Sequence, residues 1–285
     1  MHIGLFGLNG AAPIIGPDET IRVARLAEEI GYESWWAGEH VVLPSPRVAP
    51  APMEPDDPIL DPLVHLAFVA AVTRRMKLGT GIIILPQRHP LVLAKQAATL
   101  DVLAAGRLVL GIGAGYLEPE MTAIGVSMHD RGAKTDEYID AMRAIWTDGA
   151  PVAFHGRHVE FSGVDAHPRP VQTGGPAIVI GGHSPSAHRR AVARGHGWYG
   201  FNLTVDVAIE QVAGLRAAAA SVERPAALGP LEISVTPRGR VDQTMAREYA
   251  DAGVDRLVCR PLPNTDAATI ERNLHDLAPL IAALA

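Results

Sequence analysis

Two loops of the sequence carry residue types that bind anions or move protons. The first, residues 181–186 (GGHSPS), begins with two glycines, which let a backbone approach a ligand closely. Ser184 can cap the helix that follows, with Pro185 at its first position. Free N–H groups at a helix start favour phosphate, and Arg189 and Arg190 follow one turn later. The loop therefore indicates a phosphate site, although an ordinary capped strand–helix turn has the same residues.

The second loop places Glu39 and His40 directly before a proline-rich segment. An imidazole titrates near neutral pH and serves as a general acid or base. A structural histidine is the plainer interpretation, but a position at the end of a predicted strand favours function. The sequence contains neither the H-E-x-x-H nor the G-x-S-x-G pattern, and the histidines at 155, 158 and 167 lack ligand spacing. We therefore predict no metal site.

A third glycine-rich stretch, residues 111–115 (GIGAG), is similar to a dinucleotide-binding fingerprint. Tyr116 stands where the third glycine of that fingerprint belongs, so the pattern is weak as a Rossmann signal. As a strand end, Gly113, Ala114 and Gly115 supply small residues against which a planar ring could lie.

The elements that must position these loops alternate regularly along the chain. Short apolar runs predict strands, and each is followed by a longer segment with helical spacing. The predicted strands are residues 2–8, 33–37, 77–85, 108–113, 177–180, 197–201, 231–235 and 256–259. The predicted helices are residues 18–30, with Asp18 as cap, 62–74, 91–104, 136–146, 185–194, 205–219, 243–252 and 267–284.

Eight consecutive strand–helix pairs predict a parallel sheet closed into a single (β/α)8 TIM barrel spanning residues 1–285. An open doubly wound sheet is the alternative, but fewer strands are usual there. Two segments exceed a minimal barrel: the proline-rich residues 41–60 after strand two, and residues 150–173, which predict a hairpin inserted before strand five. Either could be a plain connection or a wall of the substrate site. Because a barrel carries its active site where the strands end, all three loops fall at one mouth.

Composition excludes several functions for this chain of 285 residues. The 25 Lys and Arg against 31 Asp and Glu give a net charge of −6, which offers nucleic acid little attraction. The single Cys259 can form neither an internal disulfide nor a thiolate zinc site. No apolar run is long enough to cross a membrane, and no leader-like segment follows Met1. We expect a cytoplasmic protein.

Seven stretches, in this order, resemble the bacterial-luciferase-like (LLM class) flavin and deazaflavin oxidoreductases over essentially the whole chain. They are residues 36–44 (WAGEHVVLP), 78–82 (LGTGI), 95–101 (KQAATLD), 106–108 with 111–116 (GRL, GIGAGY), 131–132 (RG), 176–182 with Ser184 (PAIVIGG) and 195–198 (GHGW). The likeness is greatest to the actinobacterial branch that uses coenzyme F420. The resemblance implies a hydride transfer between a deazaflavin and a small organic substrate, and a homodimer.

The resemblance also implies roles for individual residues. Gly81 and Ile82, as a non-prolyl cis peptide, would back the cofactor ring, and Gly113, Ala114 and Gly115 would admit it. The phosphate would lie on Gly181, Gly182 and Ser184. Arg88, Arg189 or Arg190 would meet the acidic tail of the coenzyme.

The same resemblance assigns the chemistry to strand two. His40 would handle the proton, Glu39 would orient or polarise it, and Tyr116 or Arg88 would contact substrate. Sugar-phosphate dehydrogenases of the family have a tryptophan and a glutamate where Pro44 and Tyr116 stand here, which argues against that substrate.

Three alternatives stay open from the sequence. The first is an FMN-dependent monooxygenase that receives reduced flavin from a separate reductase and uses O2. The second is a flavin-binding protein without turnover. The third is an unrelated phosphosugar aldolase or isomerase, which is disfavoured because Lys77, Lys95 and Lys134 lie away from the predicted strand ends.

Overall fold

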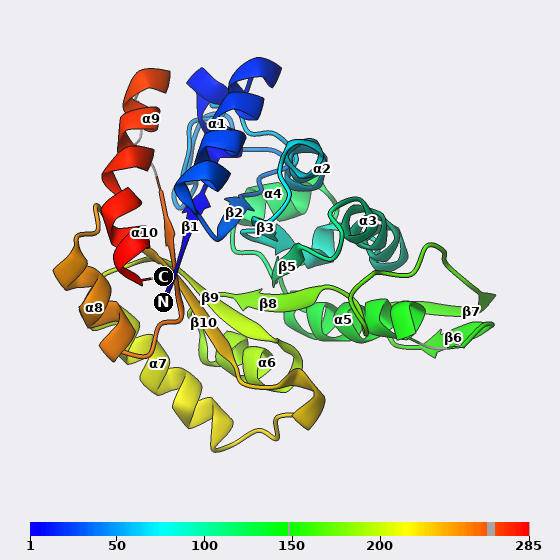
Figure 1. Ribbon diagram of the computed structural model, residues 1–285. Coiled ribbons are helices and arrows are strands. Elements are labelled where there is room, and N and C mark those ends of the chain that lie inside the picture. Colours follow the sequence, from blue (N-terminus) through cyan, green and yellow to red (C-terminus); the bar gives the residue numbers. More distant parts are fainter. Residues whose placement is uncertain (148, 261–265, 285) are drawn as a thin grey trace.

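The computed structural model describes residues 1–147, 149–260 and 266–284. Parallel strands form a closed barrel with helices around it, as predicted (Figure 1). The strands are β1 (His2–Phe6), β2 (Ser34–Ala37), β3 (Lys77–Thr80), β4 (Ile83–Ile84), β5 (Leu108–Gly113), β8 (Ala177–Gly181), β9 (Gly197–Leu203), β10 (Glu232–Pro237) and β11 (Arg256–Cys259). Their order is β3-β2-β1-β11-β10-β9-β8-β5, and β5 pairs again with β3 and with β4, which closes the ring.

Ten α-helices lie within the described part of the chain. They are α1 (Pro17–Ile30), α2 (Pro62–Val72), α3 (Pro90–Leu103), α4 (Glu118–Ala123), α5 (Arg131–Thr147), α6 (Pro185–Arg194), α7 (Val205–Ala219), α8 (Gln243–Asp251), α9 (Ala267–Asp276) and α10 (Ala278–Leu284). None of them is both long and apolar enough to cross a membrane. The predicted hairpin is present as β6 (Val152–His155) and β7 (Glu160–Val164), which pair antiparallel and project from the barrel (Figure 1).

The structure corrects several predicted boundaries. Strand one ends at Phe6, because Gly7 turns the chain with φ +76° into a short 3-10 helix. Gly16, not Asp18, caps the first helix. The predicted strand 77–85 is divided into β3 and β4 at the cis peptide Gly81–Ile82.

Two helix predictions also change. The helix predicted at residues 136–146 begins earlier, at Arg131, and the one predicted at 267–284 divides at Leu277 into α9 and α10. The short helix α4 was not predicted at all, and it contributes a residue to the site described below.

Side chains alternate between two cores along each strand. One set faces the helices, including Leu5, Trp35, Leu257 and Cys259. The other set fills the barrel interior and is centred on Trp36, Tyr199, Val109, Val179 and Val258, with Phe6, Ile82 and Phe201 above them towards the strand ends. The Trp36 and Tyr199 rings stack at 5.4 Å between centroids. The interior is therefore filled by a packed core.

The amino-terminal end of the barrel is sealed by ion pairs around Arg256. Its guanidinium donates to both carboxylate oxygens of Glu33 at 2.8 and 2.9 Å, to Ser234 at 3.0 Å and to Glu232. Lys77 also pairs with Glu33, at 2.9 Å. Arg256 is 1% exposed, and its two carboxylate partners hold its charge inside the barrel.

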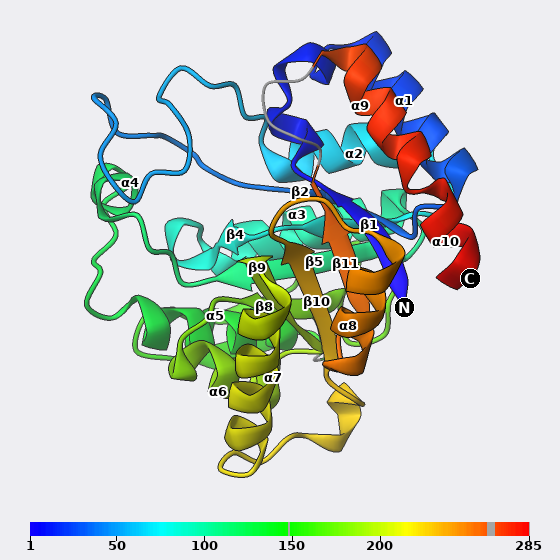
Figure 2. The ribbon, with the colours of Figure 1, turned by 90° about the vertical axis from the view of Figure 1, so that its left-hand side faces the viewer.

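The carboxyl-terminal ends of the strands form the mouth. The proline-rich segment and α4 both lie on this side of the barrel (Figure 2). Asn9, fully buried, fixes the segment at its root: its amide donates to the carbonyls of Gly38 and Leu60 at 2.9 and 2.8 Å and accepts the Gly38 N–H at 3.0 Å. Both ends of the long connection are thereby tied to the loop after β1.

Candidate active site at the barrel mouth

His40 lies just after β2 and is held by a residue that sequence reasoning missed. Its Nδ1 is 2.9 Å from Oε2 of Glu120, a buried carboxylate on α4. The other oxygen of Glu120 accepts the N–H of Val41 at 2.7 Å. Because a carboxylate only accepts, Nδ1 carries the proton of the imidazole and Nε2 is left for another partner. Glu120 thus fixes both the orientation and the tautomer of His40.

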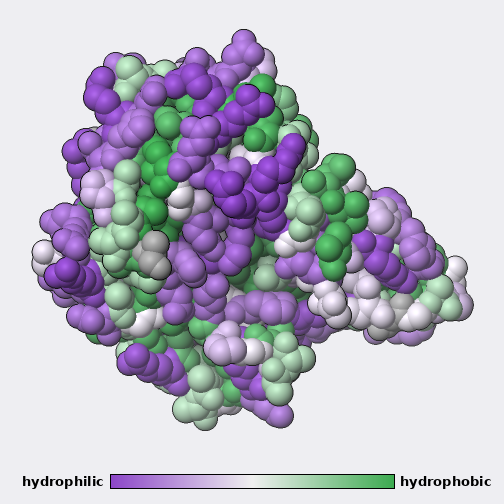
Figure 3. All heavy atoms as spheres, viewed as in Figure 1, coloured by the Kyte–Doolittle hydropathy of each residue, from purple (hydrophilic) through white to green (hydrophobic). Residues whose placement is uncertain are grey.

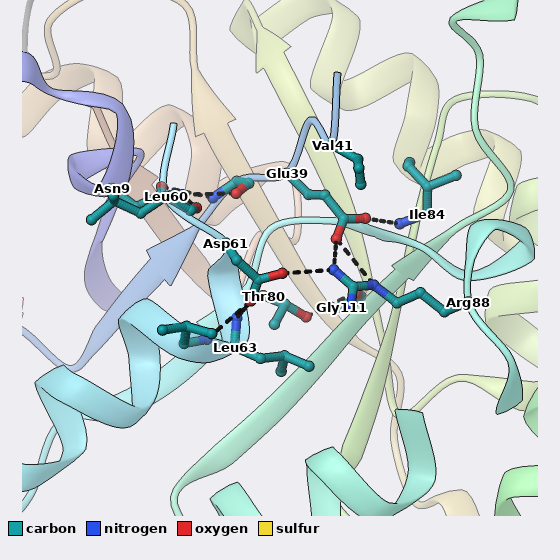
Figure 4. A network of polar contacts seen from close by, with 12 residues as sticks. Asn9, Glu39, Val41, Leu60, Asp61, Leu63, Thr80, Ile84, Arg88 and Gly111 are labelled. Atoms are coloured by element: carbon teal, nitrogen blue, oxygen red, sulfur yellow. Dashed lines mark hydrogen bonds and ion pairs between the residues drawn. The ribbon is translucent and has the colours of Figure 1, made fainter. Parts of the chain in front are cut away.

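Glu39 points elsewhere. Its carboxylate accepts the N–H of Ile84 at 2.6 Å and a hydrogen bond from Nε of Arg88 at 3.2 Å, with a second, shorter contact from the same guanidinium (Figure 4). The expectation that Glu39 orients the proton of His40 is therefore corrected: Glu120 occupies that place. Burial raises the pKa of Glu39, and Arg88 and the Ile84 N–H oppose that rise.

The Arg88 guanidinium is shared between two carboxylates. Besides Glu39 it contacts Oδ2 of Asp61 at 3.0 Å, and these two acids raise the pKa of Arg88 against its burial. Asp61 also caps α2, since its Oδ1 accepts the N–H groups of Leu63 and Val64. The network in Figure 4 therefore joins the end of β2, the start of α2 and strand β4. Arg88 is therefore engaged by two carboxylates within the protein.

The segment predicted to back the cofactor ring, Gly81–Ile82, lies just before Ile84 of this network, and we call it the ring shelf. Gly81–Ile82 is a non-prolyl cis peptide, at the position that the family resemblance indicated. The Ile82 side chain is half-buried and packs against three glycines. A Cβ atom added to Gly111, Gly113 or Gly181 would lie 2.8, 2.9 or 2.7 Å from it, respectively. Gly113 and Gly181 thus make room first for Ile82, which itself presents an apolar surface to the mouth.

The other predicted ring contacts follow the same pattern. Gly115, at φ +85°, lies against Ile84 and Met121, and its carbonyl accepts from Arg131 at 3.0 Å. Ala114 is half-buried beside it. Tyr116 is 51% exposed, and its ring meets the His40 ring edge-on at 6.2 Å between centroids. Burial, with Glu120 nearby, raises the pKa of Tyr116. The structure thus brings Tyr116 and His40 together.

The predicted phosphate loop opens onto solvent. Gly182 and Ser184 are exposed, and Ser184 caps α6 by accepting the N–H of Ala187 at 3.2 Å. The loop is tied to its neighbour strand, since the Gly182 carbonyl accepts the Trp198 indole N–H at 2.7 Å and His183 Nε2 accepts the Phe201 N–H at 3.1 Å. A rigid helix start with exposed N–H groups fits a phosphate.

The two arginines on α6 differ in what they can do. Arg190 is buried; it pairs with Asp136 at 2.6 Å and donates to the Gly132 carbonyl. Arg189 is exposed and forms no ion pair within the described residues. Of the three arginines predicted to meet the coenzyme tail, Arg189 is the one whose charge faces solvent.

Comparisons with known proteins agree with the fold. The model of the luciferase-like monooxygenase family matches residues 1–281, and the chain belongs to this family. An uncharacterized Mycobacterium tuberculosis protein is 35% identical over 193 residues, which cover 65% of this chain and 68% of that protein. The oxygenase component of the flavin-dependent trigonelline monooxygenase of Acinetobacter baylyi is 30% identical over 62% of this chain and 46% of its own length.

Solved structures share the whole fold at lower identity. The monooxygenase RslO1 from Streptomyces bottropensis superposes with a TM-score of 0.78 at 23% identity, and each chain is fully covered. An F420-dependent secondary alcohol dehydrogenase, solved with an F420-acetone adduct, gives a TM-score of 0.77 at 15% identity, covering 100% of this chain and 99% of its own. The chain is therefore a luciferase-like oxidoreductase or monooxygenase. Its fold is shared by a monooxygenase and by an F420-dependent dehydrogenase.

Proposed function

We propose that the protein is an F420-dependent oxidoreductase that moves a hydride between the deazaflavin and a small organic substrate. The observation that carries the proposal is the His40–Glu120 pair at the mouth. A hydride transfer to or from an organic substrate is accompanied by a proton, and a carboxylate-held imidazole can give or take it. The F420-dependent structural neighbour supports the choice of cofactor.

The mouth fits a planar cofactor with a phosphate. The Ile82 side chain supplies an apolar shelf for the ring, and Gly182, Ser184 and the start of α6 supply the anion site. Arg189 follows one turn along α6, where an acidic tail beyond the phosphate could reach it. The bound deazaflavin would supply or accept the hydride.

The residues around the shelf then have separate tasks. His40, with Nδ1 fixed by Glu120, offers Nε2 to the substrate proton. Glu39 acts through its bond to Ile84: it holds the shelf segment in place and is a positioning residue. Tyr116, exposed beside His40, can donate a hydrogen bond to a substrate because its raised pKa keeps it protonated.

A second candidate, FMN-dependent monooxygenation, is favoured by one observation. Arg88 and Arg190 form ion pairs inside the protein, which leaves Arg189 as the remaining predicted contact of an acidic tail. FMN ends at its phosphate and requires no such contact. A separate reductase would then supply the reduced flavin, and O2 would be the co-substrate.

Equilibrium binding of F420 and of FMN, followed by fluorescence, separates the two candidates. Tight F420 binding with weak FMN binding supports the proposal; the reverse moves the protein to the monooxygenases. Arg189→Met is expected to weaken F420 by about tenfold and FMN little, with Arg247→Met on α8 as the control of equal charge. Binding of neither cofactor by the purified chain overturns both candidates.

Turnover tests the proton role. Once a substrate is found, His40→Ala is expected to lower kcat/KM by about 10²-fold or more, while His129→Ala, an exposed histidine, leaves it unchanged. An unchanged kcat/KM in His40→Ala across pH 5 to 9 excludes the proton role. Cofactor binding with no turnover by the wild type on any substrate tested favours the non-catalytic alternative.

The family resemblance also implies a homodimer, and we propose one. Apolar side chains gather on the outer face of α2 and α3, where Val64, Phe68, Val92 and Leu103 are exposed (Figure 3). The mass of the purified chain in solution, measured by light scattering, tests this directly.

A further inference from the structure

Arg260 follows β11 on the side of the strand that faces the barrel interior. Side chains of this strand alternate: Leu257 and Cys259 face the helices, whereas Arg256 and Val258 face the interior. Arg260 continues the second set at the mouth. Its guanidinium carbon lies 5.8 Å from the centre of the Phe201 ring, which belongs to the interior core. The side chain is therefore aimed across the mouth and is exposed there.

Among residues 1–147, 149–260 and 266–284, no carboxylate pairs with Arg260. The acids that surround the mouth have other partners: Glu39 and Asp61 share Arg88, and Glu120 binds His40 and the Val41 N–H. Within the described residues Arg260 forms no ion pair; its guanidinium lies over the face of Phe201, and its charge also acts on the buried Tyr199. An exposed cation over an aromatic ring can still bind an anion through all its N–H groups.

The surface beside Arg260 is apolar and continuous with the ring shelf. Phe201 and Phe6 are both half-buried and touch at 5.0 Å between centroids. Phe6 in turn lies against the shelf: a Cβ at Gly81 would be 3.0 Å from its ring. Phe201 is held in place, because its N–H donates to His183. A cation, two aromatic rings and the shelf therefore follow one another across the mouth.

We propose that Arg260 is a substrate-recognition residue, and that the substrate is a small organic acid. Its anionic oxygens would bind the Arg260 guanidinium, and its apolar part would lie on Phe201 and Phe6 towards the shelf. This inference rests on the proposed function in one respect: it takes the anion that binds at Arg260 to be the substrate of the enzyme. A planar guanidinium binds carboxylate and phosphate alike, so both belong to the expected class.

Binding of three matched probes tests the proposal. Benzoate, phenyl phosphate and neutral benzamide share the ring and differ in charge and shape, and calorimetry gives their affinities for the chain with and without cofactor. We expect at least one of the two anions to bind about tenfold or more tightly than benzamide, and the stronger anion identifies the group. Arg260→Met should abolish that preference, Arg260→Lys should keep part of it, and Arg247→Met should leave it unchanged.

Three results overturn the proposal. One is a wild type that binds both anions no more tightly than benzamide. Another is an equal loss of preference in Arg247→Met, which would assign the effect to net charge. The third is an Arg260→Met variant that loses F420 or FMN affinity and keeps the anion preference, which would make Arg260 a cofactor ligand. If neither cofactor binds while the Arg260-dependent preference persists, the cofactor proposal fails and the acid site stands.

Discussion

Arg256 begins β11 and Arg260 follows its end, four residues later, and each has an aromatic face 5.8 Å from its guanidinium carbon. At the amino-terminal end, Arg256 is buried over Trp36 and bound by Glu33, Glu232 and Ser234. At the mouth, Arg260 is exposed over Phe201 and has no carboxylate within the described residues. The same residue type, arginine, therefore closes one end of the barrel and, at the other end, has its charge, unpaired among the described residues, free for a ligand.

The buried acids at the two ends of the barrel also differ in the direction of their pKa shifts. Glu33 has two cations, Arg256 and Lys77, and they lower its pKa to about 2 in spite of burial. Glu39 shares its single cation with Asp61 and is more deeply buried, so its pKa is raised. An acid stabilised in its charged form supports the fold, whereas an acid held in a costly charged form is more typical of a functional region. On this argument Glu33 stabilises the bottom of the barrel, whereas Glu39 belongs to the candidate site at the mouth.

The largest effect expected from this comparison is on folding stability. Arg256→Met removes a buried cation and leaves two carboxylates without it, so the free energy of unfolding should fall by about 3–4 kcal/mol. Arg260→Met, the matched change at the mouth, should cost no more than about 1 kcal/mol, because an exposed cation–π contact is weak. Urea unfolding of both variants measures the difference. Equal losses would remove the distinction between the two ends.

A smaller effect is expected when the bottom is titrated. The folded pKa of Glu33, about 2, lies below its ordinary value of 4.5, so the native state binds fewer protons in this interval. Its contribution to stability is fully present above pH 4.5 and is lost as the pH falls towards 2. With a discount for partial exposure, we expect about 2–3 kcal/mol. The difference in unfolding free energy between wild type and Glu33→Gln should shrink over this interval; a constant difference would contradict it.

Much of the fold could be predicted because short stretches of the sequence determine most of its strands and helices. The apolar runs that became β5, β9 and β11 and the capped helix α6 need no distant contact to be recognised. The hairpin of residues 152–164 followed from alternating residues around a Gly-containing turn. Eight consecutive strand–helix pairs with right-handed connections favour a closed barrel, which the structure confirms.

The site was harder, because its pairs join distant residues. His40 and Glu120 are 80 positions apart, and Glu39 and Arg88 are 49 apart. Two acids near two basic residues admit more than one pairing, and the family resemblance assigned the neighbouring Glu39 to His40. Helix α4 was missed because it is one short segment with a proline in its first turn. The positions of Arg256 and Arg260 could have been predicted from the sequence. Together with Val258 they alternate with Leu257 and Cys259, which face the helices, and this alternation places both arginines on the interior side.

The smallest effect is expected at the mouth. In Glu39→Gln the amide oxygen can still accept the Ile84 N–H, Arg88 keeps Asp61, and no carboxylate charge has to be buried at position 39. Because the folded pKa of Glu39 is raised, its charged form opposes folding above that pKa, and the wild type gains from Glu39 protonation as the pH falls.

The sign of the pH effect is therefore opposite to that of Glu33. We expect Glu39→Gln to change the free energy of unfolding at pH 7 by less than about 1 kcal/mol, and to gain on the wild type as the pH rises from 4.5. Urea unfolding at several pH values, with Glu33→Gln measured in parallel, tests both statements. A loss above about 2 kcal/mol at pH 7 would show that the Glu39–Arg88 pair supports the fold as strongly as the Glu33–Arg256 pair, and the mouth would then be as rigidly built as the bottom.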